Sequence, residues 1–193
     1  RRVRETERKY EAPAELELTD PAQLFDLAVG SQDEFELDAT YFDTADLRLA
    51  RAGLTLRRRV GGDDEGWHLK LPVRKDTRQE LHAPLGEGTG GSVPARLADQ
   101  VKDITAGQPL HPVAILDTER TVVTLPGPSG APLVEVADDL VTAIRFGEPD
   151  SGPMTWREIE VEALSPDSGA AAAMLESVGT ALREAGARPS ASG

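Results

Sequence analysis

Apolar and polar residues alternate with a period of two along much of this chain. In WREIEVEAL, residues 156–164, apolar side chains at 159, 161 and 163 alternate with glutamates at 158, 160 and 162. This alternation is typical of a strand with one buried face. The pattern predicts strands at Arg2–Tyr10, Phe35–Phe42, Leu54–Val60, Trp67–Val73, Thr77–Leu81, Glu119–Leu125, Leu133–Val141, Thr142–Phe146 and Met154–Leu164.

Three helices interrupt the predicted strands. Asp20 caps a short first helix with Pro21 at its first position, the second covers Pro94–Ile104, and the third covers about Ala170–Ala185. The turn-type segments GGDDEG, PGPSG and GEPDSGP favour antiparallel neighbours. The pattern therefore predicts an α+β fold with helices outside the sheet. Closure of the sheet into a barrel would remove its exposed edges.

The polar face of most predicted strands is charged rather than merely polar. Like charges a few ångströms apart repel one another, so such a face needs counter-charges. Two arrangements fit this pattern of faces. One is an open sheet whose charged side faces solvent, and the other is a barrel with a charged lumen and an apolar outer surface. The charged residues that share a strand face are Glu5, Glu7 and Lys9; Arg57 and Arg59; His68 and Lys70; Arg78 and Glu80; Glu135 and Asp139; and Glu158, Glu160 and Glu162.

The chemistry of these faces favours a metal and a phosphate chain. Carboxylate oxygens are the ligands that Mg²⁺ and Mn²⁺ prefer, and Arg and Lys suit phosphate oxygens. A lumen with carboxylates on one wall and basic groups on another would bind both together.

Composition narrows the classes of protein. The 193 residues carry a formal net charge of −13, which argues against nucleic acid or an anionic membrane as a partner. There is no cysteine, which excludes disulfides and thiolate chemistry. No apolar run approaches the roughly 20 residues of a membrane span, and the charged N-terminus does not look like a signal peptide. We therefore expect a cytoplasmic protein.

The order of the charged motifs resembles the CYTH domain, the fold of the triphosphate tunnel metalloenzymes. ETERK resembles the E-x-E-x-K signature of that family. YFDTADLRLARAGLTLRRR, HLKLP, RQE, TERTVVTL, VEVADDLV and EIEVEAL then follow in the family's order. The resemblance covers Glu5 to about Ala187. It implies an eight-stranded antiparallel barrel with a polar lumen over residues 1–187, followed by a linker over 188–193.

The resemblance also implies the roles of individual residues. The metal, Mg²⁺ or Mn²⁺, would be bound by Glu5, Glu7, Asp139, Glu160 and Glu162. The substrate-binding residues would be Lys9, Arg57, Arg59, Lys70, Arg78 and Arg120, with Glu80 as the lumen partner of Arg78. The catalytic set would be Glu5, Glu7, Lys9, Glu160 and Glu162.

Two features of the aspartates and the C-terminus bear on these assignments. Asp139 is preferred to Asp138 as the family's aspartate, because Asp138 has the apolar parity of Val134 and Val136. Members of the family commonly carry a lysine after the terminal helix in a Ser-Lys context, whereas this chain reads RPSASG there. Bacterial CYTH domains often precede a helical CHAD domain, and this segment resembles such a junction.

The resemblance implies hydrolysis of inorganic triphosphate to diphosphate and phosphate. The alternatives are adenylate cyclase or thiamine-triphosphatase activity, and a polyphosphate-binding module with little turnover, which the missing lysine favours. Trp67 has the apolar parity of its strand and is expected in the core, whereas the role of Trp156 is open. The three histidines, His68, His82 and His111, are scattered and are expected to be structural or exposed, although His68 shares the parity of Lys70.

Overall fold

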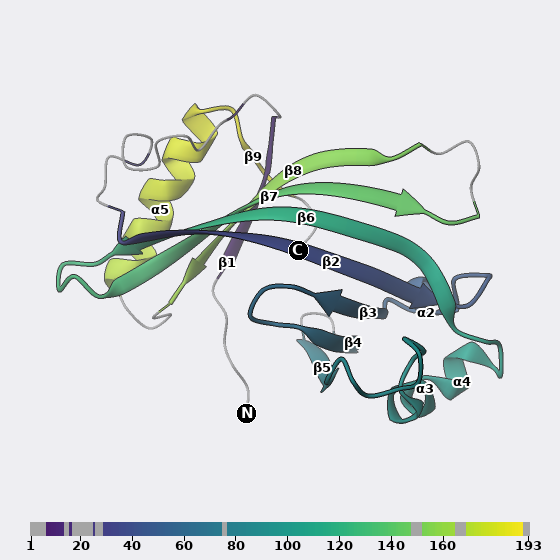
Figure 1. Ribbon diagram of the computed structural model, residues 1–193. Coiled ribbons are helices and arrows are strands. Elements are labelled where there is room, and N and C mark those ends of the chain that lie inside the picture. Colours follow the sequence, from purple (N-terminus) through teal and green to yellow (C-terminus); the bar gives the residue numbers. More distant parts are fainter. Residues whose placement is uncertain are drawn as a thin grey trace. The chain divides into compact units, whose positions relative to one another are not determined.

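The computed structural model describes residues 7–13, 16, 25, 29–74, 77–147, 152–164 and 169–190. Nine strands in this part of the chain form one sheet, in the order β5-β4-β3-β2-β6-β7-β8-β1-β9 (Figure 1). The helices are α2 (Arg48–Arg51), α3 (Ala95–Gln100), α4 (Lys102–Thr105) and α5 (Gly169–Glu184). The strands are β1 (Glu7–Ala12), β2 (Ser31–Asp43), β3 (Thr55–Val60), β4 (Gly66–Arg74), β5 (Thr77–Ala83), β6 (His111–Pro126), β7 (Pro132–Arg145), β8 (Met154–Ala163) and β9 (Arg188–Pro189).

The expectation of an α+β fold with a large antiparallel sheet is confirmed, but the strand count differs. Arg188 and Pro189, assigned from the sequence to a linker, pair with Glu11 and Tyr10 and so add β9. Within the described ranges, β5 and β9 end the strand order and do not pair with each other. The sheet is therefore not the closed eight-stranded barrel that the resemblance implied.

Several element boundaries also differ from those predicted. Leu133–Val141 and Thr142–Phe146 form one continuous strand, β7. The helix predicted over Pro94–Ile104 is divided into α3 and α4, because Val101 between them has φ −117°. The predicted helix beginning at Asp20 lies outside the described residues, apart from Phe25.

The sequence YFDTAD forms a tight turn that leads into α2. The Asp43 carboxylate is buried and accepts hydrogen bonds from the backbone N–H groups of Thr44, Leu49 and Ala50, at 2.7, 2.9 and 3.0 Å. The Thr44 hydroxyl oxygen accepts another from the N–H of Arg48 at 3.0 Å. These bonds satisfy N–H groups at the start of a helix that have no intrahelical partner, which explains why this helix can be so short.

The chain forms two compact units: unit 1 is Arg1–Phe35, Glu119–Val141 and Thr155–Gly193, and unit 2 is Glu36–Thr118 and Thr142–Met154. Each has its own core. In unit 1, α5 packs its apolar stripe on the strands, and an added Cβ at Gly179 would lie 2.5 Å from the Tyr10 hydroxyl. The glycine thus permits the close approach of α5 to β1. The core of unit 1 includes Tyr10, Val123, Val134, Ile159, Val161, Leu175, Val178 and Leu182.

The core of unit 2 is built around Trp67, which is fully buried. Its ring lies 5.0 Å from that of Phe42, centroid to centroid. The expectation that Trp67 packs in the core is confirmed, so it is not available to stack on a ligand. The other members of this core are Leu49, Leu54, Leu56, Leu69, Ala83, Leu97 and Val101. Within the residues the structure describes, no helix is long and apolar enough to cross a membrane.

Candidate functional site

Pairing of β1 with β8 (Figure 1) brings the charged residues from Glu7 onward beside the last E-x-E motif, Glu160–Glu162. In this antiparallel pair, Glu7 lies opposite Glu162 and Lys9 lies opposite Glu160. Directly opposed residues project from the same face of a sheet, and so do residues two apart on one strand. Charged residues of β1 and β8 therefore form one face, here called the acidic face: Glu7, Lys9, Glu11, Glu158, Glu160 and Glu162.

Lys9 is held on this face by an ion pair with Glu158, whose carboxylate lies 2.6 Å from its ammonium. The same carboxylate accepts a hydrogen bond of 3.0 Å from the indole of Trp156. Burial acts to lower the pKa of Lys9, but the hydrogen bond and charge of Glu158, with the charges of Glu160 and Asp139, together raise it. Lys9 is therefore a firmly protonated cation among carboxylates.

Glu160 has the properties of a metal ligand. It is half-buried, and it makes no hydrogen bond or ion pair with any residue that the structure describes, because Lys9 is engaged by Glu158. Glu7 and Glu162 lie on the same face. Carboxylate oxygens grouped in this way match the donor set of Mg²⁺ or Mn²⁺. The residues present on the acidic face therefore fit a divalent cation.

Arg120 and Asp139 form a bidentate ion pair between β6 and β7. The guanidinium Nε and Nη2 donate to the two carboxylate oxygens at 2.7 and 2.8 Å. The hydrogen bond with Asp139 raises the pKa of Arg120 against the opposing effect of burial, and the charges of Glu160 and Glu135 add to the rise. The structure thus joins a predicted metal ligand to a predicted phosphate ligand, and the carboxylate orients the guanidinium.

Asp138 lies on the apolar face of β7, as its place in the sequence predicted. It accepts two hydrogen bonds from Arg157 on β8, at 2.8 and 2.5 Å, and both side chains are nearly buried. Asp138 therefore has a structural partner away from the acidic face. This geometry supports the choice of Asp139, whose charge acts on Lys9, as the aspartate of the site.

In unit 2, β3, β4 and β5 carry a second charged face, here called the basic face. Arg57 lies opposite His68, Lys70 lies opposite Glu80, and Arg59 shares the parity of Arg57. The Arg57 Nε is buried and has no hydrogen-bond partner within the described residues. A buried guanidinium N–H in this state is suited to an anionic oxygen.

Two predicted site residues cannot be placed in this way. Glu5 lies outside the described residues. The backbone of Arg78 lies opposite Pro72 in the β4–β5 pair, and nothing further is described for its side chain. The structure therefore assembles the predicted residues Glu7, Lys9, Arg120, Asp139, Glu160 and Glu162 in unit 1, and Arg57, Arg59 and Lys70 in unit 2.

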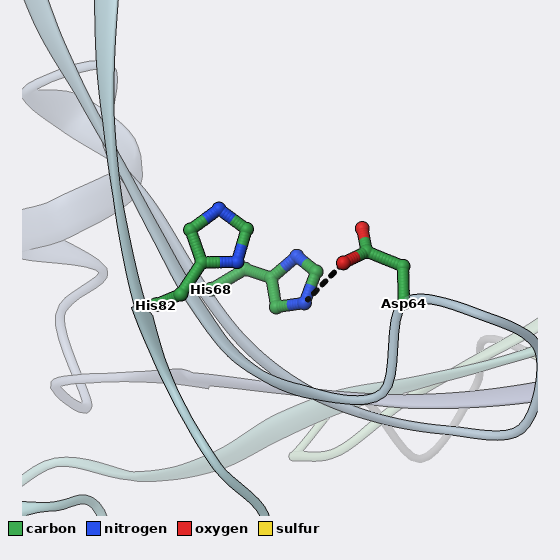
Figure 2. A group of neighbouring side chains, drawn as sticks. All are labelled: Asp64, His68 and His82. Atoms are coloured by element: carbon green, nitrogen blue, oxygen red, sulfur yellow. Dashed lines mark ion pairs between the residues drawn. The ribbon is translucent and has the colours of Figure 1, made fainter. Parts of the chain in front are cut away.

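Two histidines that the sequence analysis treated as scattered lie next to each other, so that expectation is wrong for them. His68 and His82 are opposite each other on β4 and β5, with ring centroids 4.6 Å apart. Figure 2 shows Asp64 beside the same pair. Burial, followed by the charge of Arg57, lowers the pKa of His68, which favours the neutral imidazole. The sequence shows that His82 and Glu80 share one face of their strand. With the register of the β4–β5 hairpin, this would have placed His82 beside His68.

A carboxyl pair on β2 and β6 gives a pH dependence of stability. A hydrogen bond with Asp117 and burial, with the charges of Asp117 and Glu36, raise the pKa of Asp38 to about 6. A raised carboxyl pKa stabilises the fold below the unfolded pKa, and the contribution is lost as pH rises through about 6. We therefore expect Asp38→Asn to raise Tm by about 1–3 °C at pH 8 and by clearly less at pH 5, because the loss begins at the unfolded pKa of 3.8 and is complete only above about 6. Thermal melts at both pH values test this, with Asp33→Asn on the same strand as the control; an equal shift at both would contradict it.

Comparisons with known proteins identify the family of the chain. The model of the CYTH domain matches residues 3–188, and the chain belongs to the CYTH family. The chain is 44% identical over 166 residues to two uncharacterized proteins of Mycobacterium tuberculosis, Rv2226 and MT2285, a match that covers 82% of the chain and 32% of each relative. It therefore spans about a third of the length of these relatives.

Two solved structures share the fold. One is HpAC1 from Hippeastrum, with a TM-score of 0.51 at 16% identity over 98% of this chain and 92% of that one. The other is a candidate adenylate cyclase from Bacillus halodurans, with a TM-score of 0.50 at 20% identity over 93% of this chain and 86% of that one. At these identities the similarity concerns the fold alone.

Proposed function

We propose that this protein is a divalent-metal-dependent phosphohydrolase that cleaves inorganic triphosphate to diphosphate and phosphate. The observation that carries the proposal is the register of β1 and β8, which sets Glu7 on one face with Glu160 and Glu162, with Glu160 unpaired among the described residues. Such a face is self-repelling and fits a divalent cation. Membership of the CYTH family implies a ligand that contains triphosphate.

The acidic face would hold the metal, with Glu7, Glu160 and Glu162 as ligands together with Glu5. When bound, Mg²⁺ or Mn²⁺ would neutralise phosphate charge as a Lewis acid. Asp139 would serve by orienting Arg120 through its bidentate ion pair. In this proposal Asp139 is a positioning residue rather than a direct metal ligand.

The basic groups would bind phosphate oxygens and stabilise the charge that develops on them during transfer. Arg57, Arg59, Lys70, Arg78, Arg120 and Lys9 form this set. Two of its members, Lys9 and Arg120, have pKa values that their surroundings raise, so both keep their positive charge across the range in which a triphosphate is fully ionised. The structure of HpAC1 is described as revealing a dominant triphosphatase activity, which supports the same reaction class here.

A second candidate is activity on an organic triphosphate, either as an adenylate cyclase or as a thiamine triphosphatase. The observation that favours it is Trp156, which is 36% exposed and is anchored through its indole N–H to Glu158 on the acidic face. An anchored, exposed indole is suited to stacking on a base or thiazole ring. A third candidate is a polyphosphate-binding module with little turnover.

One assay separates these candidates. Phosphate release is measured from tripolyphosphate, ATP and thiamine triphosphate, each with Mg²⁺ or Mn²⁺, for the unmodified chain and for Glu7→Gln. Release from tripolyphosphate that the substitution abolishes supports the proposal. Cyclic AMP from ATP, or preferred hydrolysis of thiamine triphosphate, would favour the second candidate instead. Tight binding of tripolyphosphate without release of phosphate would favour the third.

A further inference from the structure

Asp64, His68 and His82 form a cluster of metal-ligating groups that shares no residue with the acidic face. Each offers one ligand atom, and the three atoms lie within 4.8 Å of one another (Figure 2). His68 and His82 come together through the β4–β5 register, and Asp64 comes from the loop between β3 and β4. All three belong to unit 2.

The Nε2 atom of His68 gives the clearest indication that this cluster binds a metal. The His68 side chain is 1% exposed, and its Nε2 is buried with no hydrogen-bond partner in the described part of the chain. It points at the Asp64 carboxylate, whose Oδ1 lies 3.6 Å away, beyond hydrogen-bond distance. Ligand atoms at zinc distances in a tetrahedron lie about 3.4 Å apart, so this spacing suits two ligands of one zinc ion better than a direct bond.

Glu80 supplies the outer support that such a histidine site requires. One of its carboxylate oxygens lies 3.3 Å from Nδ1 of His68 and 3.3 Å from Nε2 of His82. A carboxylate that accepts the N–H of a ligating histidine fixes the tautomer and directs the other ring nitrogen to the metal. Zinc at Nε2 requires the His68 tautomer that carries its proton on Nδ1, and the Glu80 oxygen at 3.3 Å would accept that proton in the zinc-bound state.

In the structure the Arg57 Nη2 donates a hydrogen bond to the same Nδ1 at 3.3 Å, so zinc binding must replace this hydrogen bond. The charged groups near the cluster are the carboxylates of Asp64 and Glu80, the guanidinium of Arg57 and the ammonium of Lys70, which lies opposite Glu80. Their formal charges balance, so the donor atoms and not a net charge favour the cation.

We propose that Asp64, His68 and His82 bind a zinc ion with an open fourth position. Two imidazoles and one carboxylate are a zinc donor set, whereas Mg²⁺ and Mn²⁺ prefer oxygen ligands alone. The side chains of Asp64 and His82 are 60% and 53% exposed, so water or an anionic ligand can reach the fourth position. The site does not depend on the proposed hydrolysis.

Calorimetric titration of the 193-residue chain with Zn²⁺, in excess Mg²⁺ to occupy the carboxylates of the acidic face, tests the proposal. We expect one zinc ion per chain. His82→Gln and Asp64→Asn are each expected to weaken binding at least about tenfold. Both residues are exposed, so neither change disturbs the core. His111→Gln, which removes the third histidine of the chain at the start of β6, is the matched control and should bind zinc as the unmodified chain does.

Co²⁺ gives a second readout that does not involve activity. A tetrahedral Co²⁺ with two imidazole ligands has intense visible absorption, which we expect for the unmodified chain and for His111→Gln but not for His82→Gln. Identical zinc isotherms for the unmodified chain, His82→Gln and Asp64→Asn would overturn the proposal. So would zinc binding that Glu160→Gln abolishes, because that ion would belong to the acidic face.

Discussion

Replacement of Glu160 by glutamine is expected to lower metal-dependent hydrolysis of tripolyphosphate by about a hundredfold or more. The substitution keeps the size of the side chain and removes one negative charge from the acidic face. Because Glu160 makes no ion pair with any described residue, its loss breaks no contact that the fold needs. The expected effect is therefore on metal affinity and turnover, with Tm unchanged or slightly raised.

The measurement is the rate of phosphate release across a Mg²⁺ titration, with thermal melts in parallel. Glu184→Gln, an exposed glutamate at the end of α5, makes the same chemical change away from the site and serves as the control. Full activity in Glu160→Gln at low Mg²⁺ would remove Glu160 from the metal site. A fall in activity that matches a fall in Tm would mean that the residue is structural.

Replacement of Arg157 by methionine is expected to destabilise the protein strongly while leaving the chemistry of the acidic face in place. The Arg157 and Asp138 side chains are only 10% and 11% exposed, and two hydrogen bonds join them. Removing the guanidinium leaves the Asp138 carboxylate nearly buried and without its cation. Such a loss costs about 3 kcal/mol, which lowers Tm by about 6–12 °C in a chain of this size.

The double variant Arg157→Met with Asp138→Leu tests the cause. Replacing both partners by apolar groups removes the unpaired charge, so most of the lost Tm should return. Urea unfolding of the two single variants and the double variant gives the free energies of unfolding for a complete double-mutant cycle. If Asp138→Leu alone abolished metal-dependent turnover at a temperature where it stays folded, the aspartate of the site would be Asp138 and not Asp139.

The faces of the strands were predictable because side-chain direction in a strand depends only on parity. Trp67 was expected inside and is fully buried, and Asp138 was expected on the apolar side and lies there. Arg57 and Lys70 were expected on the polar side, and the register of β3 and β4 puts both there. Alternation is a local property, and the backbone geometry of a strand translates it directly into two faces.

Pairing partners were not predictable in the same way. β1 lies near one end of the chain and β8 near the other, and their register decides that Lys9 meets Glu160 while its ammonium binds Glu158. The adjacency of His68 and His82 likewise depends on the register of β4 and β5, which has a bulge between Pro72 and Arg74. A shift of one residue in that register would have sent one imidazole to the opposite face.

The amino-acid sequence by itself determined which side chains share a face, and its ordered motifs indicated the CYTH family. Only the tertiary structure decided which charge pairs with which: Asp139 with Arg120, Asp138 with Arg157, and Asp64 with the two histidines. The physical reason is that parity is set within one strand. An ion pair or a metal site instead requires atoms from separate strands to come within a few ångströms, and strand register controls that distance.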